Sequence, residues 1–479
     1  MKNKNITIKL MVLTSLLIAG EDHSEYIEGP FNSVHEVTET CIECHEDAAH
    51  SFMQDVHWTW ESKPMAVPGK SEPVVLGKKS TINNFCITLK GNEARCTSCH
   101  AGYGWKDDSF DFSDPTNIDC LVCHDQTGTY KKFPLGAGYP VTERTEFPAN
   151  SSNFYEPPNL EEISQSVGDI PTRQACGSCH FFGGGANNVK HGDLGKELIN
   201  PSRELDVHMG GADFTCAECH KTTGHQIPGD LMSVSTDRGD LACEGCHTDE
   251  PHPKSSRLNH HAKSVACQTC HIPEFARANP TKMYWDWSTA GQDIEVENDE
   301  YGMPMYNKKK GNAIWDKNVI PTYAWYSGQS EHMIIGDAID LDSINKITSP
   351  VGDKSDLKAK IYPFFVHGGK QIADKVNKYL LPTHVFGGYW KHFDWDKAVR
   401  NGAKEYGLKY SGKYTFVETE MWWKINHMVA PEENTINCTA CHSKTRTTRM
   451  DWKALGYPDG DPRYNKGTAR LEYIRSDYE

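Results

Sequence analysis

Apolar residues are spread thinly along this chain, and only one stretch forms a continuous apolar run. Residues 10–19 (LMVLTSLLIA) follow three lysines, Lys2, Lys4 and Lys9. Such a run is too short to cross a bilayer as a helix, and a short apolar run behind a positive segment is typical of a secretory signal peptide. No later stretch is long enough to span a membrane. The pattern therefore predicts a signal peptide at 1–20, no transmembrane segment, and a mature protein that is periplasmic or secreted.

The composition leaves little material for an ordinary hydrophobic core. Hydrophobic residues make up 37% of the 479 residues, and the mean hydropathy is −0.63. A chain of this length normally folds into two or more domains around apolar cores, so we expect something other than side chains to fill part of the interior. The 50 Lys and Arg against 65 Asp and Glu give a formal charge of −15. This acidic balance argues against nucleic-acid binding, which needs a basic face.

Seventeen cysteines and 23 histidines carry the strongest pattern in the chain. The motif Cys-x-x-Cys-His occurs eight times, whereas random placement of these residues would give about 0.03 occurrences, so the motif is not accidental. The eight motifs, numbered 1 to 8 along the chain, are Cys41/Cys44/His45, Cys96/Cys99/His100, Cys120/Cys123/His124, Cys176/Cys179/His180, Cys216/Cys219/His220, Cys243/Cys246/His247, Cys267/Cys270/His271 and Cys438/Cys441/His442.

This motif is typical of covalent attachment of c-type haem. Its two thiols add to the haem vinyl groups, and the adjacent histidine becomes the proximal iron ligand. A zinc site would not need a histidine after every Cys-x-x-Cys pair, and disulfides would not need this spacing, although an exported protein permits them. The sequence therefore predicts eight covalently bound haem c groups. The acid excess also allows a calcium site, although the chain has no loop of the EF-hand type.

Eight haems change the expected architecture, because each macrocycle is a large apolar plate that can serve as core. Motifs 1 to 7 start only 24 to 56 residues apart, so neighbouring haems should be nearly in contact. We predict a multihaem cytochrome c, mainly α-helical with long irregular loops and little β-structure, organised around a packed array of eight haems. Residues 21–275 would form a haem-rich domain. Residues 276–479, rich in aromatics, carry motif 8 and either cover one end of the array or form a second domain with its own core.

Fifteen histidines lie outside the motifs. A six-coordinate electron-transfer haem takes a second axial ligand, and imidazole suits iron. For any single histidine, a surface or structural role is an equal alternative. The preferred distal ligands stand in haem-dense sequence or beside aromatic residues, and they are His57, His191, His208, His225, His252, His261 and His427.

Cys86 is the one cysteine outside the motifs. A buried, inert thiol is the ordinary interpretation of such a residue. An exported compartment is oxidising, however, so an unused thiol there is chemically exposed. A thiolate beside an iron can attack a sulfur–sulfur bond by exchange, and we therefore favour a functional role for Cys86.

Five stretches of the chain resemble the octahaem tetrathionate reductase family of multihaem cytochromes c, which is related to hydroxylamine oxidoreductases and multihaem nitrite reductases. The stretches are INNFC (82–86), NEARCTSCHAGYGWKD (92–107), DCLVCHDQTGTYKKFP (119–134), CGSCHFFGGGANNVKHGDL (176–194) and PTKMYWDWSTAG (280–291). The resemblance implies mostly bis-histidine haems around one catalytic haem at motif 2. In that family the catalytic iron carries a lysine amine, with a cysteine close by. By local match, these two residues are Lys190 and Cys86.

The chain departs from the family's pattern at one position. An acid is expected three residues before the lysine, and Asn187 stands there. An acid could relay protons or orient the lysine, whereas an amide can only hydrogen-bond. Lys131 and Lys132, just after motif 3, are the rival ligands. Because substrate and protein are both negative, these lysines together with Lys190 are also expected to make the pocket locally positive.

The implied function is that of an exported haem-dependent oxidoreductase. It would reduce tetrathionate, a small anion, to thiosulfate with two electrons at a lysine-ligated haem, while the other haems relay electrons from quinol-linked proteins or small cytochromes. Two alternatives remain open. One is reduction of nitrite or hydroxylamine in the same haem architecture, and the other is a non-catalytic conduit or wire subunit for extracellular electron transfer. An oligomer is compatible with each.

Overall fold

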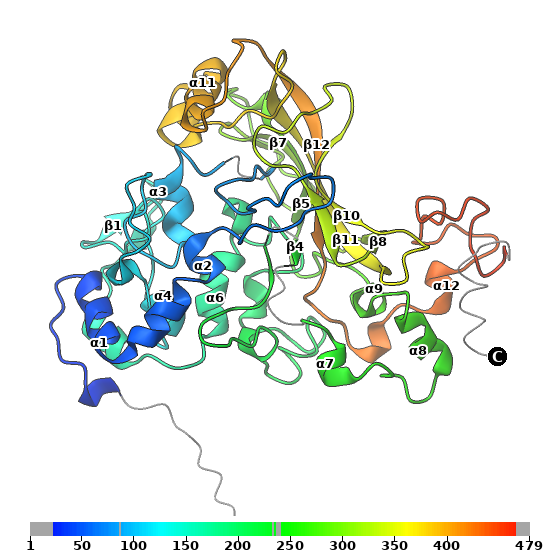
Figure 1. Cartoon of the computed structure of the whole chain (residues 1–479), viewed down its shortest axis with the longest axis horizontal. Helices are drawn as coiled ribbons and strands as arrows, with labels where there is room; N and C mark the ends of the chain where they lie inside the picture. The colour runs from blue at the N-terminus through cyan, green and yellow to red at the C-terminus, as the bar shows by residue number, and fades with distance from the viewer. Residues whose placement is uncertain (1–22, 86–87, 232–233, 236–240, 466–479) are drawn as a thin grey trace, which may run out of the picture.

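The computed structural model describes residues 23–85, 88–231, 234–235 and 241–465 (Figure 1). The predicted signal peptide at 1–20 and Cys86 lie outside these residues. Short helices and long irregular loops make up the first half of the chain, and one large β-sheet dominates the second half. In the described residues, no helix is both long and apolar enough to cross a membrane.

Most of the α-helices are only one or two turns long, and α1 and α11 are the exceptions. Side chains cap several of them: Ser33, Thr172 and Asp394 each accept a hydrogen bond from a backbone N–H in the first turn of α1, α6 and α11. The helices are α1 (Val34–Phe52), α2 (Val56–Thr59), α3 (Glu93–Cys96), α4 (Leu121–His124), α5 (Leu160–Gln165), α6 (Arg173–His180), α7 (Glu244–His247), α8 (Ser256–Ala262), α9 (Cys267–His271), α10 (Trp390–His392), α11 (Trp395–Glu405) and α12 (Cys438–Cys441).

The strands form one large mixed sheet and two small hairpins. The large sheet has the order β6-β7-β5-β11-β12-β10-β9, and β8 also pairs with β11. β11 and β12 are antiparallel from Phe364 opposite Lys424 to Asp374 opposite Tyr414, whereas β5 runs parallel to β11 and β10 runs parallel to β12. The strands are β1 (Thr145–Glu146), β2 (Phe154–Tyr155), β3 (Asp230–Leu231), β4 (Val234–Ser235), β5 (Thr281–Asp286), β6 (Tyr306–Asn307), β7 (Gly311–Asp316), β8 (Thr322–Tyr326), β9 (Gln329–His332), β10 (Asn345–Val351), β11 (Lys360–Asp374) and β12 (Tyr414–Lys424).

This sheet corrects the expectation of a mainly α-helical protein with little β-structure. In β12, buried and partly buried residues alternate along YTFVETEMWWK, the period of two that a strand with one face on a core requires. The aromatic content of 276–479 indicated an apolar surface, and the interpretation overlooked this alternation. The aromatic side chains pack on one another and on the sheet.

The main hydrophobic core lies against the large sheet. It includes Trp285 of β5, Phe365 of β11 and buried residues of α11, and Phe85 and Val189 from the first half of the chain join it. Helices α1 to α6 lie to one side of the sheet, and α7, α8, α9 and α12 gather on the other side (Figure 1). The sheet is therefore a scaffold between two groups of motif-bearing helices.

Candidate haem sites

Each motif lies on or beside a short helix or helical turn, and this explains its spacing. In α6, Cys176 and Cys179 are three residues apart and share a helix face, and His180 ends the helix. The sixteen motif cysteines all carry thiols, and none of these described residues forms a disulfide. Both sulfurs of each motif are therefore available for thioether bonds.

The motif cysteines are less enclosed than a packed array predicts, because five of them are exposed. Cys44 of motif 1 lies in a continuous exposed stretch of α1, residues 43–47, and Cys246 of motif 6 lies in α7, a single turn without a buried residue. The expectation that protein and neighbouring haems enclose every attachment site is therefore wrong for Cys44 and Cys246. The physical reason is that both lie on helix faces turned away from the hydrophobic clusters. The five exposed motif cysteines are Cys44, Cys99, Cys219, Cys246 and Cys438.

Seven of the eight motif histidines face a second imidazole in the described part of the chain. The ring centroids of each pair are 5.9–6.5 Å apart. With the motif histidine first, the pairs are His45–His23, His124–His225, His180–His57, His220–His427, His247–His208, His271–His252 and His442–His261.

These separations fit two imidazoles on opposite sides of one iron. A metal–imidazole nitrogen bond is about 2.0–2.1 Å long and the ring centre lies about 1.2 Å behind the nitrogen, so two axial ligands have centroids about 6.4 Å apart. Burial lowers the pKa of His180 to about 3, which keeps this imidazole in the neutral form that binds metal. No group of three or more His, Cys, Asp or Glu side chains in the described residues is arranged to hold a bare metal ion. The pairs therefore suit an iron whose other ligands come from a macrocycle.

Six of the seven histidines preferred from the sequence lie in these pairs. His191 does not, because its ring packs against Trp423 at 5.1 Å. The partner of His45 is instead His23, at 6.3 Å, which sequence reasoning missed. Its position just after the expected signal peptide, and 22 residues before His45, put it outside the haem-dense sequence in which distal ligands were sought.

His100 of motif 2 has a different environment, because aromatic rings surround it. Their centroids lie 4.9–6.1 Å from the His100 ring. His100 Nε2 donates to the backbone carbonyl of Trp58 at 2.7 Å, and its Nδ1 is buried with no hydrogen-bond partner in the described residues. Burial lowers the pKa of His100 to about 3. The surrounding residues are Trp58, Trp60, Trp105, Phe110 and Phe112.

Contacts between cysteines of different motifs show which sites are neighbours. Four pairs of side chains are in hydrogen-bonding contact, and they join site 1 to 3, site 2 to 4, site 4 to 5, and site 6 to 7. Cysteines of sites 3 and 4, 5 and 6, and 7 and 8 lie within electrostatic range of each other. The sites therefore follow the order 1-3-4-5-6-7-8, and site 2 branches from site 4. The expected contact between neighbouring sites and the return of motif 8 to the array are both seen in this order.

Lys190 lies beside Trp423, a buried residue of β12. Its Nζ is 4.5 Å from the ring centroid of Trp423, and the same ring contacts Phe85 at 6.0 Å. Its charge also acts on His180 of site 4. Trp423 thus joins the Lys190 segment to the segment that precedes Cys86, the two segments that the resemblance places at one site. That Lys190 is the iron ligand at site 2 stays a prediction.

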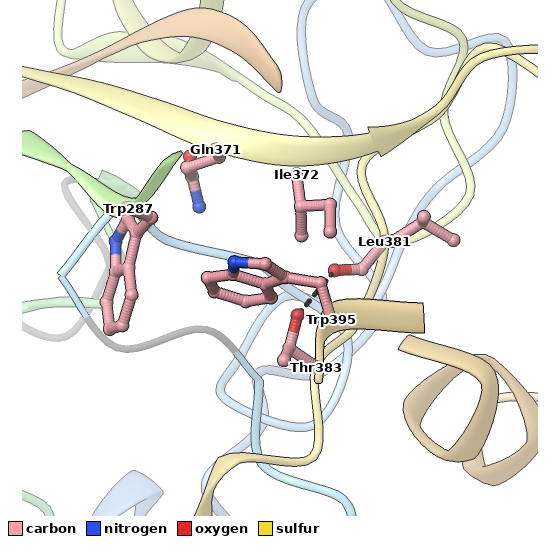
Figure 2. A pocket seen from close by; sticks show the side chains of 6 residues that line it. All are labelled: Trp287, Gln371, Ile372, Leu381, Thr383 and Trp395. Carbon is pink, nitrogen blue, oxygen red and sulfur yellow. Dashed lines mark hydrogen bonds between the residues drawn. The ribbon is translucent and has the colours of Figure 1, made fainter. Parts of the chain in front are cut away.

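The segment before Cys86 is anchored on the large sheet. Asn84 Nδ2 donates to the carbonyl of His367 at 2.9 Å, Phe85 stacks on the His367 ring at 3.9 Å, and Gln371 Nε2 donates to the carbonyl of Asn83 at 2.9 Å. Cys86 lies outside the described residues, so its role also stays a prediction. A cavity of about 10 Å³ lies next to Gln371, lined by Trp287, Gln371, Ile372, Leu381, Thr383 and Trp395 (Figure 2). It holds one water molecule at most and is too small for the substrate.

Asn187, three residues before Lys190, pairs with a carboxylate. Its Nδ2 lies 3.1 and 3.2 Å from the two carboxylate oxygens of Glu197, and its Oδ1 accepts from the backbone N–H of Lys196 at 2.8 Å. The acid that the family's pattern has in this segment is thus replaced by an amide that holds an acid from a neighbouring turn.

The rival lysines have other surroundings. Lys132 forms an ion pair of 2.8 Å with Asp119, both side chains being buried, and donates to the backbone carbonyl of His100. Lys131 is exposed. Lys132 therefore supports motif 2 from behind through its backbone.

Comparison with known proteins agrees with this geometry. The structure is similar to the crystal structure of octahaem cytochrome c from Shewanella oneidensis, with a TM-score of 0.84 and 48% sequence identity, over 94% of this chain and 99% of that one. The chain belongs to the octahaem cytochrome c family. Residues 282–445 match the family model for bacterial cytochrome c. An uncharacterized protein of Archaeoglobus fulgidus is 27% identical over 270 residues, which are 46% of this chain and 90% of that protein.

Membership in this family establishes a multihaem cytochrome fold and covalently bound haem c as the cofactor. It also makes the protein a haem-dependent redox protein with a role in electron transport. The bacterial model begins in β5 and ends just after motif 8, so the large sheet belongs to the octahaem cytochrome itself.

Proposed function

We propose that this octahaem cytochrome binds one haem c at each of its eight motifs and reduces tetrathionate to thiosulfate at site 2. One observation carries the proposal, namely that seven motif histidines face a second imidazole whereas His100 faces aromatic rings. Two imidazoles saturate an iron and suit it to electron transfer, while a site without the second imidazole leaves a position for another ligand or a substrate. The two kinds of site therefore suit different tasks.

When bound, haem c supplies one-electron redox chemistry at each site. The chain's own residues would position the substrate and balance its charge. Tetrathionate takes up two electrons, its central sulfur–sulfur bond breaks, and two thiosulfates leave, so no proton is consumed. Lys190 would supply a neutral amine as ligand, which requires loss of its proton, and the Cys86 thiolate would approach the sulfur–sulfur bond.

Two further lysines would make the substrate pocket locally positive in an acidic protein. Lys282 of β5 is buried, and its Nζ is 3.7 Å from the ring centroid of Trp285. Lys310 Nζ is 5.1 Å from the same ring and adjoins Gly185 in the loop that leads to Lys190. Positive charge focused by apolar walls attracts anions. This part is taken by Lys282 and Lys310 in place of Lys131 and Lys132, which were expected from the sequence.

The order of the sites suggests how electrons reach site 2. Sites 1 and 8 are the two ends of the series, and site 4 connects the series to site 2 through the contact between Cys99 and Cys179. We propose that quinol-linked proteins or small cytochromes deliver electrons at one of these ends. Bacterial c-type cytochromes are typically periplasmic, and we propose that this protein is periplasmic or secreted.

Nitrite or hydroxylamine reduction is the second candidate, because a lysine-ligated haem would also accept a small nitrogen oxide. EPR spectroscopy of the oxidised protein, before and after addition of tetrathionate or nitrite, tests both functions. We expect seven low-spin signals that do not respond and one distinctive signal that responds to substrate. Eight unresponsive low-spin signals would favour the electron conduit and contradict the proposal.

The variant Cys86→Ala distinguishes the sulfur substrate from the nitrogen substrate. We expect a large loss of tetrathionate reduction with nitrite reduction retained, because only the sulfur–sulfur bond is open to attack by a thiolate. Steady-state rates with both substrates, measured at equal haem content, provide the readout. Equal losses on both substrates would refute the thiol role.

A further inference from the structure

The paired histidines differ in the group that accepts the Nδ1–H bond. At three sites the acceptor is a carboxylate: His57 bonds to Asp55 at 2.8 Å, His427 to Asp193 at 3.2 Å, and His442 to Asp461 at 2.8 Å. These belong to sites 4, 5 and 8. At other positions the acceptor is neutral: His124 bonds to the carbonyl of Gly168, His220 to that of Pro228, His261 to that of Arg257, and His252 to the amide oxygen of Asn259.

The two carboxylates at sites 4 and 5 are the most deeply buried of the three. The side chains of Asp55 and Asp193 are 0% and 1% exposed. Asp55 also accepts from the backbone N–H groups of His57 at 2.8 Å and Ile227 at 2.9 Å. Asp193 also accepts from the backbone N–H groups of Asn426 at 2.8 Å and His427 at 3.0 Å. Each carboxylate is held in place by several donors, so its bond to the imidazole has a defined geometry.

A carboxylate and a carbonyl affect a metal-bound imidazole differently. A histidine that donates its second N–H to a carboxylate becomes a more basic ligand. A more basic ligand stabilises ferric iron more than ferrous iron, because the ferric ion carries the larger charge, and this lowers the reduction potential. Water screens little of the effect when the carboxylate is buried.

Sites 4 and 5 are also the two sites next to site 2 along the array. The side chains of Cys179 and Cys99 connect site 4 to site 2, and those of Cys176 and Cys216 connect site 4 to site 5. Asp193 stands three residues after Lys190 in the same loop. One segment thus carries both the proposed ligand of site 2 and the carboxylate of site 5.

We propose that Asp55, Asp193 and Asp461 lower the reduction potentials of the haems at sites 4, 5 and 8 below those of sites whose histidines bond to neutral acceptors. The inference rests on the proposed haem binding at these sites and is independent of the substrate. Sites 4 and 5 then hold the two most strongly donating electrons close to site 2. Two is also the number that one tetrathionate consumes as its central bond breaks and each thiosulfate takes one electron.

Asp193→Asn is the most conservative test. Asp193 Oδ1 has no hydrogen-bond partner in the described residues, so the new amide nitrogen can take that place while the amide oxygen keeps the three N–H bonds. We expect one of the eight midpoint potentials to move upward, with haem content and the other seven potentials unchanged. Potentiometric titration of the full-length holoprotein, followed by absorbance and EPR, measures the shift without any substrate.

Asn259→Asp is the reciprocal variant. Asn259 Oδ1 already accepts from Nδ1 of His252 at 3.2 Å, so the substitution gives site 7 the carboxylate that sites 4, 5 and 8 have. We expect one midpoint potential to move downward. Asp47→Asn controls for loss of charge, because Asp47 is exposed, and we expect it to shift no potential as far as Asp193→Asn does.

The outcomes separate this inference from the proposed function. If Asp193→Asn and Asn259→Asp leave all eight potentials in place in a fully haem-loaded protein, the tuning role is overturned while haem binding stands. A wild-type protein with fewer than eight haems would instead contradict the proposed function. Opposite shifts in the two variants would support the inference whatever the substrate proves to be.

Discussion

Sites 4 and 2 are neighbours, yet the chain has built them differently. At site 4, His180 faces His57 at 5.9 Å, and Asp55 holds the second imidazole from behind. At site 2, five aromatic rings surround His100, and a backbone carbonyl accepts its Nε2–H bond. The two motifs share the same five-residue pattern, so the difference comes entirely from the segments packed around them.

This comparison shows what separates electron transfer from substrate chemistry in such a protein. A second imidazole with a fixed hydrogen-bond acceptor closes both faces of an iron and sets its potential. An aromatic cage supplies packing and excludes water but provides no further ligand on its own. The chemistry of site 2 therefore depends on what the neighbouring segments bring to it, and the loop containing Lys190 is the candidate.

The largest expected effect comes from opening the aromatic cage. Trp105 is 4% exposed and packs against His100 with centroids 4.9 Å apart. Trp105→Ala should lower the free energy of unfolding by about 3–5 kcal/mol, because it leaves a large cavity. Urea denaturation followed by circular dichroism measures the loss, and Ile294→Ala at a half-exposed position is the control, with an expected change within about 0.5 kcal/mol. Loss of the low-spin signal of site 4 in Trp105→Ala would show that the two sites are not independent.

Removing the lysine at site 2 should affect catalysis more than stability. We expect Lys190→Ala to reduce turnover about 100-fold or more, the usual cost of removing one well-placed electrostatic group, and to leave the bis-histidine signals intact. Lys131→Ala is the matched control, because Lys131 is exposed, and we expect wild-type turnover. Equal activity in the two variants would contradict the assignment of Lys190.

The smallest expected effect on turnover comes from the far end of the array. His23→Ala should convert site 1 from bis-histidine to five-coordinate, because the second imidazole of the pair with His45 is lost. EPR should then show one low-spin signal replaced by a high-spin signal. His191→Ala should leave every low-spin signal unchanged, because His191 packs against Trp423. The reverse result would restore the ligand set expected from the sequence.

Much of the candidate chemistry could be predicted from the sequence, and most of the fold could not. The motifs are local, since Cys176, Cys179 and His180 occupy a single helical turn, so their chemistry can be recognised within five residues. Second ligands such as His57 and His427 were found because few histidines compete for the role. His23 was missed because distance along the chain says little about distance in space once the chain folds back.

The large sheet was missed for a different reason. Its central strands β11 and β12 alternate buried and partly buried residues, but the aromatic residues among them were interpreted as a cover for haems. Pairing between β5 and β11, or between β10 and β12, joins segments far apart in the sequence, and no local pattern specifies such pairs.

The sequence alone determined the cofactor, the number of attachment motifs and most of the imidazoles near them, because thioether chemistry requires fixed residue types at fixed spacing. Tertiary structure decided which imidazoles face each other, which sites adjoin, which motif cysteines such as Cys44 and Cys246 are exposed, and which histidines bond to buried carboxylates. These are long-range relations: Asp193 meets His427 across more than 200 residues, and only packing brings them together.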